Sequence, residues 1–361
     1  MNMSKIKIGI SIGDINGIGI EVILKTFTDK RIFDLCTPVV YGSSKVMAYH
    51  KNITKLDFQY NNVKSVEHCS SDRLNVMNCW TENVNINLGK PTELSGKHAA
   101  ISLDRATDDL QNGLIDAIVT APINKEAMKM ANFPFPGHTE YLAKKFSKGK
   151  SLMVMVNDDL RVGVVTGHIP VHKIKERLTK GVLLQKIKMM NHSLRYDFGI
   201  ERPTIAVLGL NPHAGDNGVI GKEEEEFIRP AIIEAKKNGV LTMGPYPADG
   251  FWGSGLYKKF DGILAMYHDQ GLIPFKLLSF NAGVNVTAGM GVVRTSPDHG
   301  TAYDIVGKNQ ANPASFRKAL FTALDIAKNR SFYVEVSENK LEKRSAKLKQ
   351  VEERAEDLVE E

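Results

Sequence analysis

Short apolar runs that end abruptly in polar residues constrain this chain more than any other feature. The clearest runs are residues 6–12, 117–120, 161–166, 204–210 and 262–267. Nearly continuous apolar runs of this length are typical of strands in a sheet that is covered on both faces. Amphipathic stretches separate them, the pattern of parallel strands joined by helical crossovers. The sequence therefore predicts an α/β fold.

The same pattern predicts where the helices lie. One helix is expected after Gly19, a second from 96 to about 110, a third over roughly 223–237, and a fourth beginning at Asn312 and Pro313 as cap and first-turn proline. The glycine-rich stretch 283–291, "GVNVTAGMG", is expected to be a loop or an irregular strand pair. The tail 338–361 is rich in lysine and glutamate, which favours a solvated helical extension; a partner-binding helix is the alternative.

Length and charge limit the classes of function. The 361 residues suffice for one large α/β domain or two lobes. A net charge of +6 without a clustered basic face or aromatic platforms disfavours nucleic-acid binding, although a small anionic ligand needs only a local cation cluster. No apolar stretch is long enough for a bilayer, and the charged start does not resemble a signal peptide. Three cysteines without metal-type spacing fit a reducing compartment, so we expect a cytoplasmic protein.

Three of the predicted strands deliver a histidine directly after they end. These histidines are His168 in "VTGH", His213 in "NPHAGDNG" and His268 in "MYHD". In an open parallel sheet the carboxyl ends of the strands share one edge, and ligands bind there. Three neutral imidazoles that leave one position open form a catalytic metal site, for which zinc is the first choice and cobalt, manganese or magnesium are alternatives. Asp249 in "YPADG" and Asp269 could orient a histidine or join the metal, or could equally cap a turn.

A second set of residues could hold an anion. Lys276, Asn285 and Arg294 follow one another at intervals of nine residues, and "PGHTEYL" places His138 and Thr139 at an expected helix start. A helix N-terminus, a guanidinium, a lysine and an amide are the groups that bind phosphate or carboxylate. The glycines of "GDINGIGIE" do not have the spacing of a Rossmann fingerprint, and "GKEEEE" lacks that of a P-loop.

Taken together, these motifs resemble a known family. "GDINGIGIE", "VTAPINKEAM", "FPGHTEYLA", "LGLNPHAGDNGVIGKEE", "AMYHDQGLIPFK" and "VRTSPDHGTAYDIVGKNQANPASF" resemble, in order, the 4-hydroxythreonine-4-phosphate dehydrogenase (PdxA) family over about residues 5–330. Two segments are also similar to the wider isocitrate/isopropylmalate dehydrogenase-like superfamily. The resemblance implies two α/β lobes with a cleft between them, one of approximately 1–133 plus 305–337 and the other of approximately 134–304.

The resemblance also assigns roles to residues. It implies metal ligands at His168, His213 and His268, and substrate contacts at His138, Thr139, Lys276, Asn285 and Arg294. It implies that His299, Gly300 and Asn312 hold the adenosine end of NAD, and that a homodimer completes the active site with residues from both subunits.

The implied reaction is NAD- and divalent-metal-dependent oxidation of 4-phosphooxy-L-threonine, followed by decarboxylation to 3-amino-2-oxopropyl phosphate, in pyridoxal 5'-phosphate (vitamin B6) biosynthesis. Lys276 is the expected acid–base residue, with Asp269 and Asp249 as catalytic candidates. A paralogous dehydrogenase of 4-phosphothreonate or 4-phosphoerythronate is the main alternative. A metal-dependent hydrolase is less well supported, since three histidines could also activate water. The choice between NAD and NADP, like the identity of the metal, is left open by the sequence.

Overall fold

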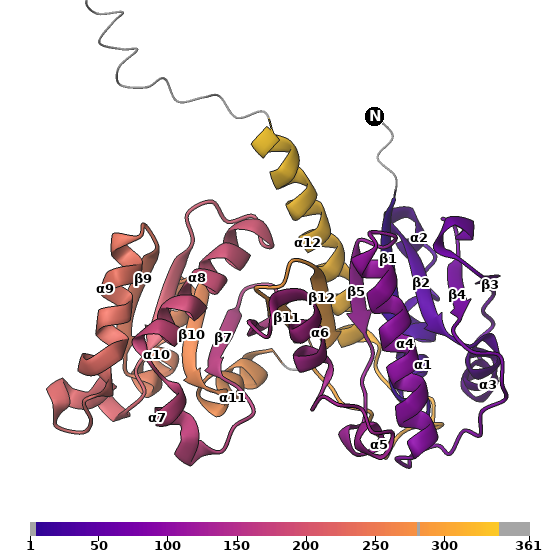
Figure 1. Cartoon of the computed structure of the whole chain (residues 1–361), viewed down its shortest axis with the longest axis horizontal. Helices are drawn as coiled ribbons and strands as arrows, with labels where there is room; N and C mark the ends of the chain where they lie inside the picture. Colours follow the sequence, from indigo (N-terminus) through magenta and orange to yellow (C-terminus); the bar gives the residue numbers. More distant parts are fainter. Residues whose placement is uncertain (1–4, 280–281, 339–361) are drawn as a thin grey trace, which may run out of the picture.

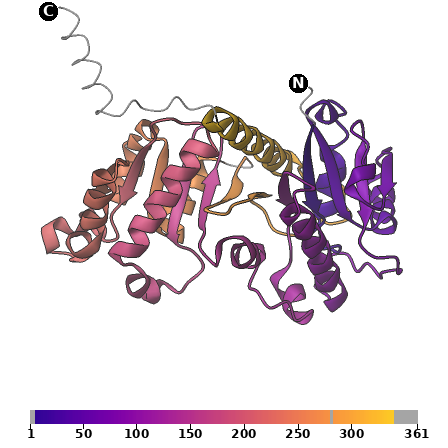
Figure 2. The ribbon, with the colours of Figure 1, turned by 45° about the horizontal axis from the view of Figure 1, so that its top comes forward.

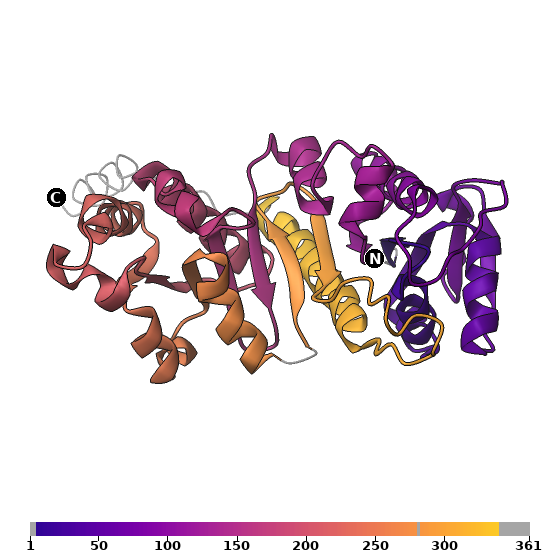
Figure 3. The same ribbon diagram turned by 90° about the horizontal axis from the view of Figure 1, so that it is seen from below.

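One mixed sheet runs through the described part of the molecule. The computed structural model describes residues 5–279 and 282–338, and its twelve strands follow the order β3-β4-β2-β1-β5-β12-β11-β6-β7-β10-β8-β9 (Figures 1 and 3). The strands are β1 Ile6–Ser11, β2 Cys36–Gly42, β3 Tyr60–Val63, β4 Leu74–Asn78, β5 Ala117–Thr120, β6 Leu152–Val156, β7 Arg161–Thr166, β8 Thr204–Leu208, β9 Leu241–Tyr246, β10 Gly262–Tyr267, β11 Val284–Ala288 and β12 Val293–Pro297.

Helices cover both faces of this sheet. The α-helices are α1 Gly19–Thr26, α2 Ile32–Leu35, α3 Ser44–Thr54, α4 Glu93–Gln111, α5 Lys125–Met130, α6 His138–Ser147, α7 Ile174–Arg177, α8 Lys180–Tyr196, α9 Arg229–Lys237, α10 Ala248–Gly253, α11 His268–Leu278 and α12 Ala314–Glu338. Helix α4 packs on β1, β2 and β5, whereas α8 packs on β7, β10 and β11. Helix α12 contacts β12, β5, β1 and α8, and Figure 2 shows it lying across the middle of the molecule.

The sheet consists of two parallel blocks joined by an antiparallel segment. Strands β3, β4, β2, β1, β5 and β12 are parallel to one another, as are β7, β10, β8 and β9. Between the blocks, β11 pairs antiparallel with both β12 and β6, and β6 pairs antiparallel with β7. The prediction of an α/β fold with parallel strands is confirmed, and this antiparallel segment is an addition that the sequence did not predict.

The stretch 283–291 contains a strand and a loop. Its first part is the strand β11, which has a hydrogen-bonded neighbour on both sides and pairs with β12, as the strand-pair alternative expected, and residues 289–291 form the loop that follows. Val284, Val286 and Ala288 are fully or almost fully buried, so burial outweighs the effect of the flanking glycines. Only Gly289, with φ of 82°, needs the conformational freedom of glycine to end the strand.

Most of the predicted elements lie where they were expected. Strands β5, β7 and β10 have the predicted bounds, while β1 and β8 end at Ser11 and Leu208. Helix α4 begins earlier than expected because Thr92 forms a capping box with Ser95. The stretch 223–237 contains a π-helical turn, Glu224–Ile228, before α9.

Helix α12 begins at Ala314, whose N–H donates to the Asn312 side chain. The predicted extension 338–361 lies, apart from Glu338, outside the described residues. In the part of the chain that the structure describes, none of the helices is both long and apolar enough to cross a membrane.

Candidate active site

A pocket of about 230 Å³ gathers residues from both blocks of the sheet. It lies where β5, β7, β11 and β12 meet the start of α6. The segments that follow β5, β7 and β10, namely α5, α7 and α11, lie along the lower edge of Figure 1. The lining residues are Thr120, Ala121, Pro122, Ile123, Lys125, Gly137, His138, Thr139, Glu140, His168, Asn285, Arg294, Ser296, Pro297, His299 and Gly300.

Arg294 is a buried cation that donates no hydrogen bond to an anionic side chain among the described residues. Its side chain starts on β12 and the residue is only 3% exposed. Its Nε and Nη2 donate to the Thr120 hydroxyl at 3.2 and 2.8 Å, and its Nη1 donates to the hydroxyls of Thr287 at 3.1 Å and Thr139 at 3.4 Å. Burial lowers the pKa of Arg294 to about 10, opposed by the nearby charge of Glu140. A guanidinium solvated only by neutral hydroxyls is costly to bury, and an anionic ligand would offset that cost.

Beside Arg294, the pocket presents hydrogen-bonding atoms that have no partner among the described residues. His138 is the first residue of α6 and is 8% exposed, yet its Nε2 is unpaired. Burial, and secondly the charge of Arg294, lower the pKa of His138 to about 3, so the ring is neutral. Asn285 Oδ1 is likewise buried and unpaired. A helix N-terminus, a buried guanidinium and unpaired hydrogen-bonding side chains are groups that can bind a phosphate.

Two of the three predicted metal ligands lie together. His168 follows β7 and His268 follows the adjacent strand β10, and their ring centroids are 5.4 Å apart. Burial lowers the pKa of His168, with smaller effects from Lys125 and His268. Neutral imidazole is the form that coordinates a metal. His268 Nδ1 lies 2.7 Å from Asp269 Oδ1, where an N–H would donate to the carboxylate and orient the ring.

Among the described residues of one chain, His213 does not join His168 and His268 in a group of three ligands. It follows β8, which neighbours β10, in a turn whose residues 213–217 all have positive φ. Among the described residues of the chain, no group of three histidine, cysteine or acidic side chains could hold a metal ion. The Glu224 carboxylate fixes the end of this strand, since it accepts the N–H groups of Leu210 and Asn211 at 2.7 and 2.8 Å.

The predicted acid–base residues lie outside the pocket lining. Lys276 is in the last turn of α11, where its ammonium pairs with Asp298 at 3.5 Å and its side chain is 56% exposed. Asp249 lies in the first turn of α10 and is exposed. The Asp269 side chain is 70% exposed, and its carboxylate contacts the ring of His268.

Sequence reasoning did not single out four residues that the pocket uses. Thr120 and Thr287 solvate Arg294, and Lys125 and Glu140 exert opposite electrostatic effects on His168. Thr120, Lys125 and Glu140 stand inside the quoted motifs "VTAPINKEAM" and "FPGHTEYLA", which is the available signal. Threonine is common in strands, so the role of the hydroxyls follows only from the tertiary approach of β12 to β5.

The predicted cofactor segment borders the same pocket. Among the described residues, His299 Nε2 is buried without a partner, and the space around the α-carbon of Gly300 is open. Both features fit a bound ligand that reaches the pocket from this side. Asn312 is exposed, and its side-chain oxygen accepts the N–H of Ala314, so it also has a structural role at the start of α12.

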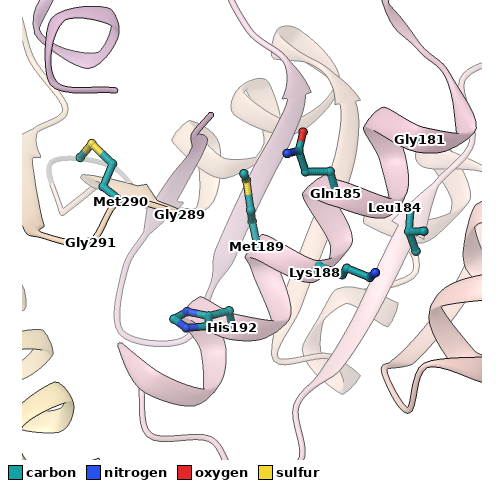
Figure 4. Close-up of a pocket in the computed structure, with 9 residues that line it drawn as sticks. All are labelled: Gly181, Leu184, Gln185, Lys188, Met189, His192, Gly289, Met290 and Gly291. Carbon is teal, nitrogen blue, oxygen red and sulfur yellow. The ribbon is translucent and has the colours of Figure 1, made fainter. Parts of the chain in front are cut away.

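A second, larger cavity lies elsewhere. It has a volume of about 620 Å³ and is lined by residues of α8 and of the loop between β11 and β12 (Figure 4). Its lining residues are Gly181, Leu184, Gln185, Lys188, Met189, His192, Gly289, Met290 and Gly291. None of the predicted catalytic, metal-binding or substrate-binding residues lines it.

Comparisons with known proteins agree on one family. The family model described as "Pyridoxal phosphate biosynthetic protein PdxA" matches residues 34–323. The chain is 51% identical over 331 residues to the 4-hydroxythreonine-4-phosphate dehydrogenase of Bacteroides thetaiotaomicron, covering 91% of both proteins. It is 36% identical to a protein of Oceanobacillus iheyensis that bears the name of a D-threonate 4-phosphate dehydrogenase, over 89% of this chain and 97% of that one.

A solved structure extends the likeness to the fold. The 4-hydroxythreonine-4-phosphate dehydrogenase from Klebsiella pneumoniae matches with a TM-score of 0.80 and 33% identity, over 91% of this chain and 99% of that one. The family resemblance found in the motifs is therefore confirmed, as is the α/β fold class.

Proposed function

The chain belongs to the PdxA family of pyridoxal phosphate biosynthetic proteins, and from that membership we propose that it is a 4-hydroxythreonine-4-phosphate dehydrogenase. In the proposed reaction, 4-phosphooxy-L-threonine is oxidised with NAD and a divalent metal ion and then loses CO2 to give 3-amino-2-oxopropyl phosphate. This step serves the synthesis of pyridoxal 5'-phosphate, in the cytoplasm.

The observation that carries the proposal is the environment of Arg294. Its buried guanidinium, the unpaired Nε2 of His138 and the N-terminus of α6 converge on one pocket. Phosphate supplies the negative charge and the acceptor oxygens that these groups lack. Binding the phosphate here would hold the rest of the substrate toward His168 and fix the geometry for hydride transfer.

The imidazoles of His168 and His268 fit a divalent cation, with His213 as the third ligand. When bound, such an ion would lower the pKa of the substrate hydroxyl and stabilise charge that develops on oxygen. Asp269 would hold the ring of His268 in its tautomer through the Nδ1 contact. Zinc is the first choice for this donor set, and cobalt, magnesium or manganese are alternatives.

We assign the cofactor-binding, substrate-binding and acid–base roles from the same family membership. NAD would accept the hydride, with His299, Gly300 and Asn312 at its adenosine end. Thr139 and Asn285 would bind substrate beside Arg294. Lys276 would bind substrate and return a proton to the carbon that loses CO2, with Asp249 and Asp269 as further acid–base candidates.

A homodimer would supply the third metal ligand. Within the described residues of one chain, His168 and His268 are the two predicted metal ligands that lie together, so we infer that His213 reaches the metal site of a second copy. Helix α11, which carries His268 and Lys276, exposes Ile273, Leu277 and Leu278, with Leu277 79% exposed. Exposed apolar side chains on the helix that bears site residues support a subunit contact there.

One assay tests the proposal directly. Purified protein is mixed with NAD and a divalent metal ion, and the absorbance of NADH is followed as each candidate substrate is added. We expect 4-phosphooxy-L-threonine to give the highest kcat/KM. A higher kcat/KM for 4-phosphothreonate or 4-phosphoerythronate would assign the chain to the second candidate function, which the relative in Oceanobacillus iheyensis favours. The absence of NADH with every substrate would overturn both.

The metal assignment makes its own prediction. His213→Ala should remove a ligand, reduce bound metal to a small fraction of the wild-type content and abolish turnover, while the circular dichroism spectrum stays unchanged. His172→Ala is the matched control, since His172 is an exposed histidine outside the pocket. Wild-type metal content in the His213 variant would contradict the assignment.

A further inference from the structure

The segment between β12 and α12 borders the pocket but has no helix or strand of its own. Its position depends on contacts with the residues that follow β1. Ile18 N–H donates to Thr301 O at 3.1 Å, and Ala311 N–H donates to the buried Glu21 carboxylate at 2.9 Å. Between these two contacts, the hydroxyl of Tyr303 donates to Asp14 Oδ2 at 2.6 Å.

Asp14, which accepts the hydrogen bond from Tyr303, is a buried carboxylate. It lies in "GDINGIGIE" and is 1% exposed, and its carboxylate also accepts from Asn16 N–H at 2.8 Å and Ser95 Oγ at 3.2 Å. All three donors are neutral. Burial raises the pKa of Asp14, while the hydrogen bonds from Tyr303, Asn16 and Ser95 oppose that effect. A buried carboxylate with neutral partners costs stability compared with a neutral side chain of the same size.

Two glycines allow the segment to approach this closely. A Cβ on Gly17 would lie 2.9 Å from the backbone oxygen of Thr301, and one on Gly89, whose φ is 75°, would lie 3.0 Å from that of Tyr303. The N–H of Asp14 donates to Pro122 O at 2.9 Å, and Pro122 lines the pocket. Asp14 therefore connects the β5 side of the pocket with the segment that carries His299 and Gly300.

We propose that Asp14, acting through the Tyr303 hydroxyl, is a positioning residue for the nicotinamide cofactor. It holds the segment 299–303 in the conformation that binds the cofactor, without itself touching the cofactor. The inference rests on the proposed function, because that function places NAD at His299 and Gly300.

Binding of NADH without substrate tests this inference separately from catalysis. NADH fluorescence titrations would compare the wild type with Tyr303→Phe, Asp14→Ala and the double variant. Each single variant should raise the Kd for NADH about tenfold, equivalent to about 1.4 kcal/mol. The double variant should be no weaker than either single variant, because both remove the same hydrogen bond. Tyr60→Phe is the control, since it removes a tyrosine hydroxyl bonded to Ser44 O at 2.9 Å far from the pocket.

Further readouts distinguish positioning from a structural role. The KM for the phosphorylated substrate, and kcat with both substrates saturating, should change by less than about threefold in Tyr303→Phe. Backbone amides 299–304 should exchange hydrogen faster than in the wild type.

An unchanged Kd for NADH in Tyr303→Phe would overturn the inference. So would an equal weakening of NADH and substrate together with a lower Tm. A wild-type protein that does not bind NADH would overturn the proposed function as well.

Discussion

At the scale of single residues, the pocket is organised around a cation whose hydrogen-bond partners, among the described residues, are uncharged. Arg294 contacts three threonine hydroxyls, one of which, Thr120, lies 174 positions away in sequence. Hydroxyls orient the guanidinium without neutralising it, so its charge stays available to a ligand. A carboxylate hydrogen-bonded to Arg294 would instead compete with the phosphate.

Arg294→Met should therefore separate ligand binding from stability. We expect kcat/KM to fall by about a hundredfold or more, because a buried charged contact to substrate is lost. The free energy of unfolding without ligand should fall by no more than about 1 kcal/mol, because removing a desolvated charge offsets the lost hydrogen bonds. Inorganic phosphate should raise the Tm of the wild type but not of this variant.

Arg161→Met is the matched control. Arg161 is partly buried over the ring of Phe198 and lies outside the pocket. Loss of the phosphate effect in both variants would contradict the prediction.

At the scale of elements, the buried side chain of His50 connects α3 to the loop after β1. His50 is 3% exposed and its Nε2–H donates to Ile15 O at 2.8 Å. Burial lowers the pKa of His50 to about 4, although the bond to Ile15 opposes this. In the unfolded chain the same ring has its ordinary pKa of about 6.5. The unfolded state thus binds more protons between about pH 6.5 and pH 4, so stability falls as the pH falls through this range.

His50→Gln should flatten this dependence, because the glutamine amide keeps a donor near Ile15 O but does not titrate. Urea unfolding from pH 7 to pH 4 should give a wild-type slope that is steeper by up to about 1.4 kcal/mol per pH unit. Parallel curves for the two proteins would show that His50 is not the titrating group.

The elements also show what the sequence could predict and what it could not. Strands β5, β7 and β10 were predictable because both of their faces are buried, which leaves a continuous apolar run. Strand β11 was predicted only as one of two alternatives, because the glycines of "GVNVTAGMG" also fit a loop and its burial depends on neighbours supplied by β6 and β12. The strand-end histidines were predictable from their position after apolar runs. Thr120 and Thr287 were not, because a strand threonine acquires its role only when Arg294 reaches it.

At the scale of the whole molecule, the proposed site needs two copies of the chain. One copy contributes His168, His268 and the pocket around Arg294. We assign His213 to the other copy. Leu277→Glu should shift the protein to a monomer in analytical ultracentrifugation and abolish turnover, because Leu277 is an exposed apolar residue on α11. Leu35→Glu is the control, an exposed leucine on α2 that should leave the dimer intact. A fully active monomer would contradict a shared site.

Mixing two inactive variants provides a sharper test of sharing. His213→Ala and Arg294→Met should each be inactive alone. After subunit exchange, half of the dimers are mixed, and each of these regains one intact site, so about a quarter of wild-type activity should return. Failure of the mixture to gain activity, when sedimentation shows that subunits have exchanged, would place His213 in the same site as Arg294 of its own chain.

The antiparallel segment in the middle of the sheet also determines how the two halves of a subunit can move. Among the described residues, strand pairing runs without interruption from β5 through β12, β11 and β6 to β7, so the two halves are joined here by the sheet itself. Any change in the angle between the halves has to appear as added torsion shared by these strands. Asn285 lies on β11 and Arg294 on β12. A phosphate bound to both side chains would therefore resist a change in the twist between these two strands.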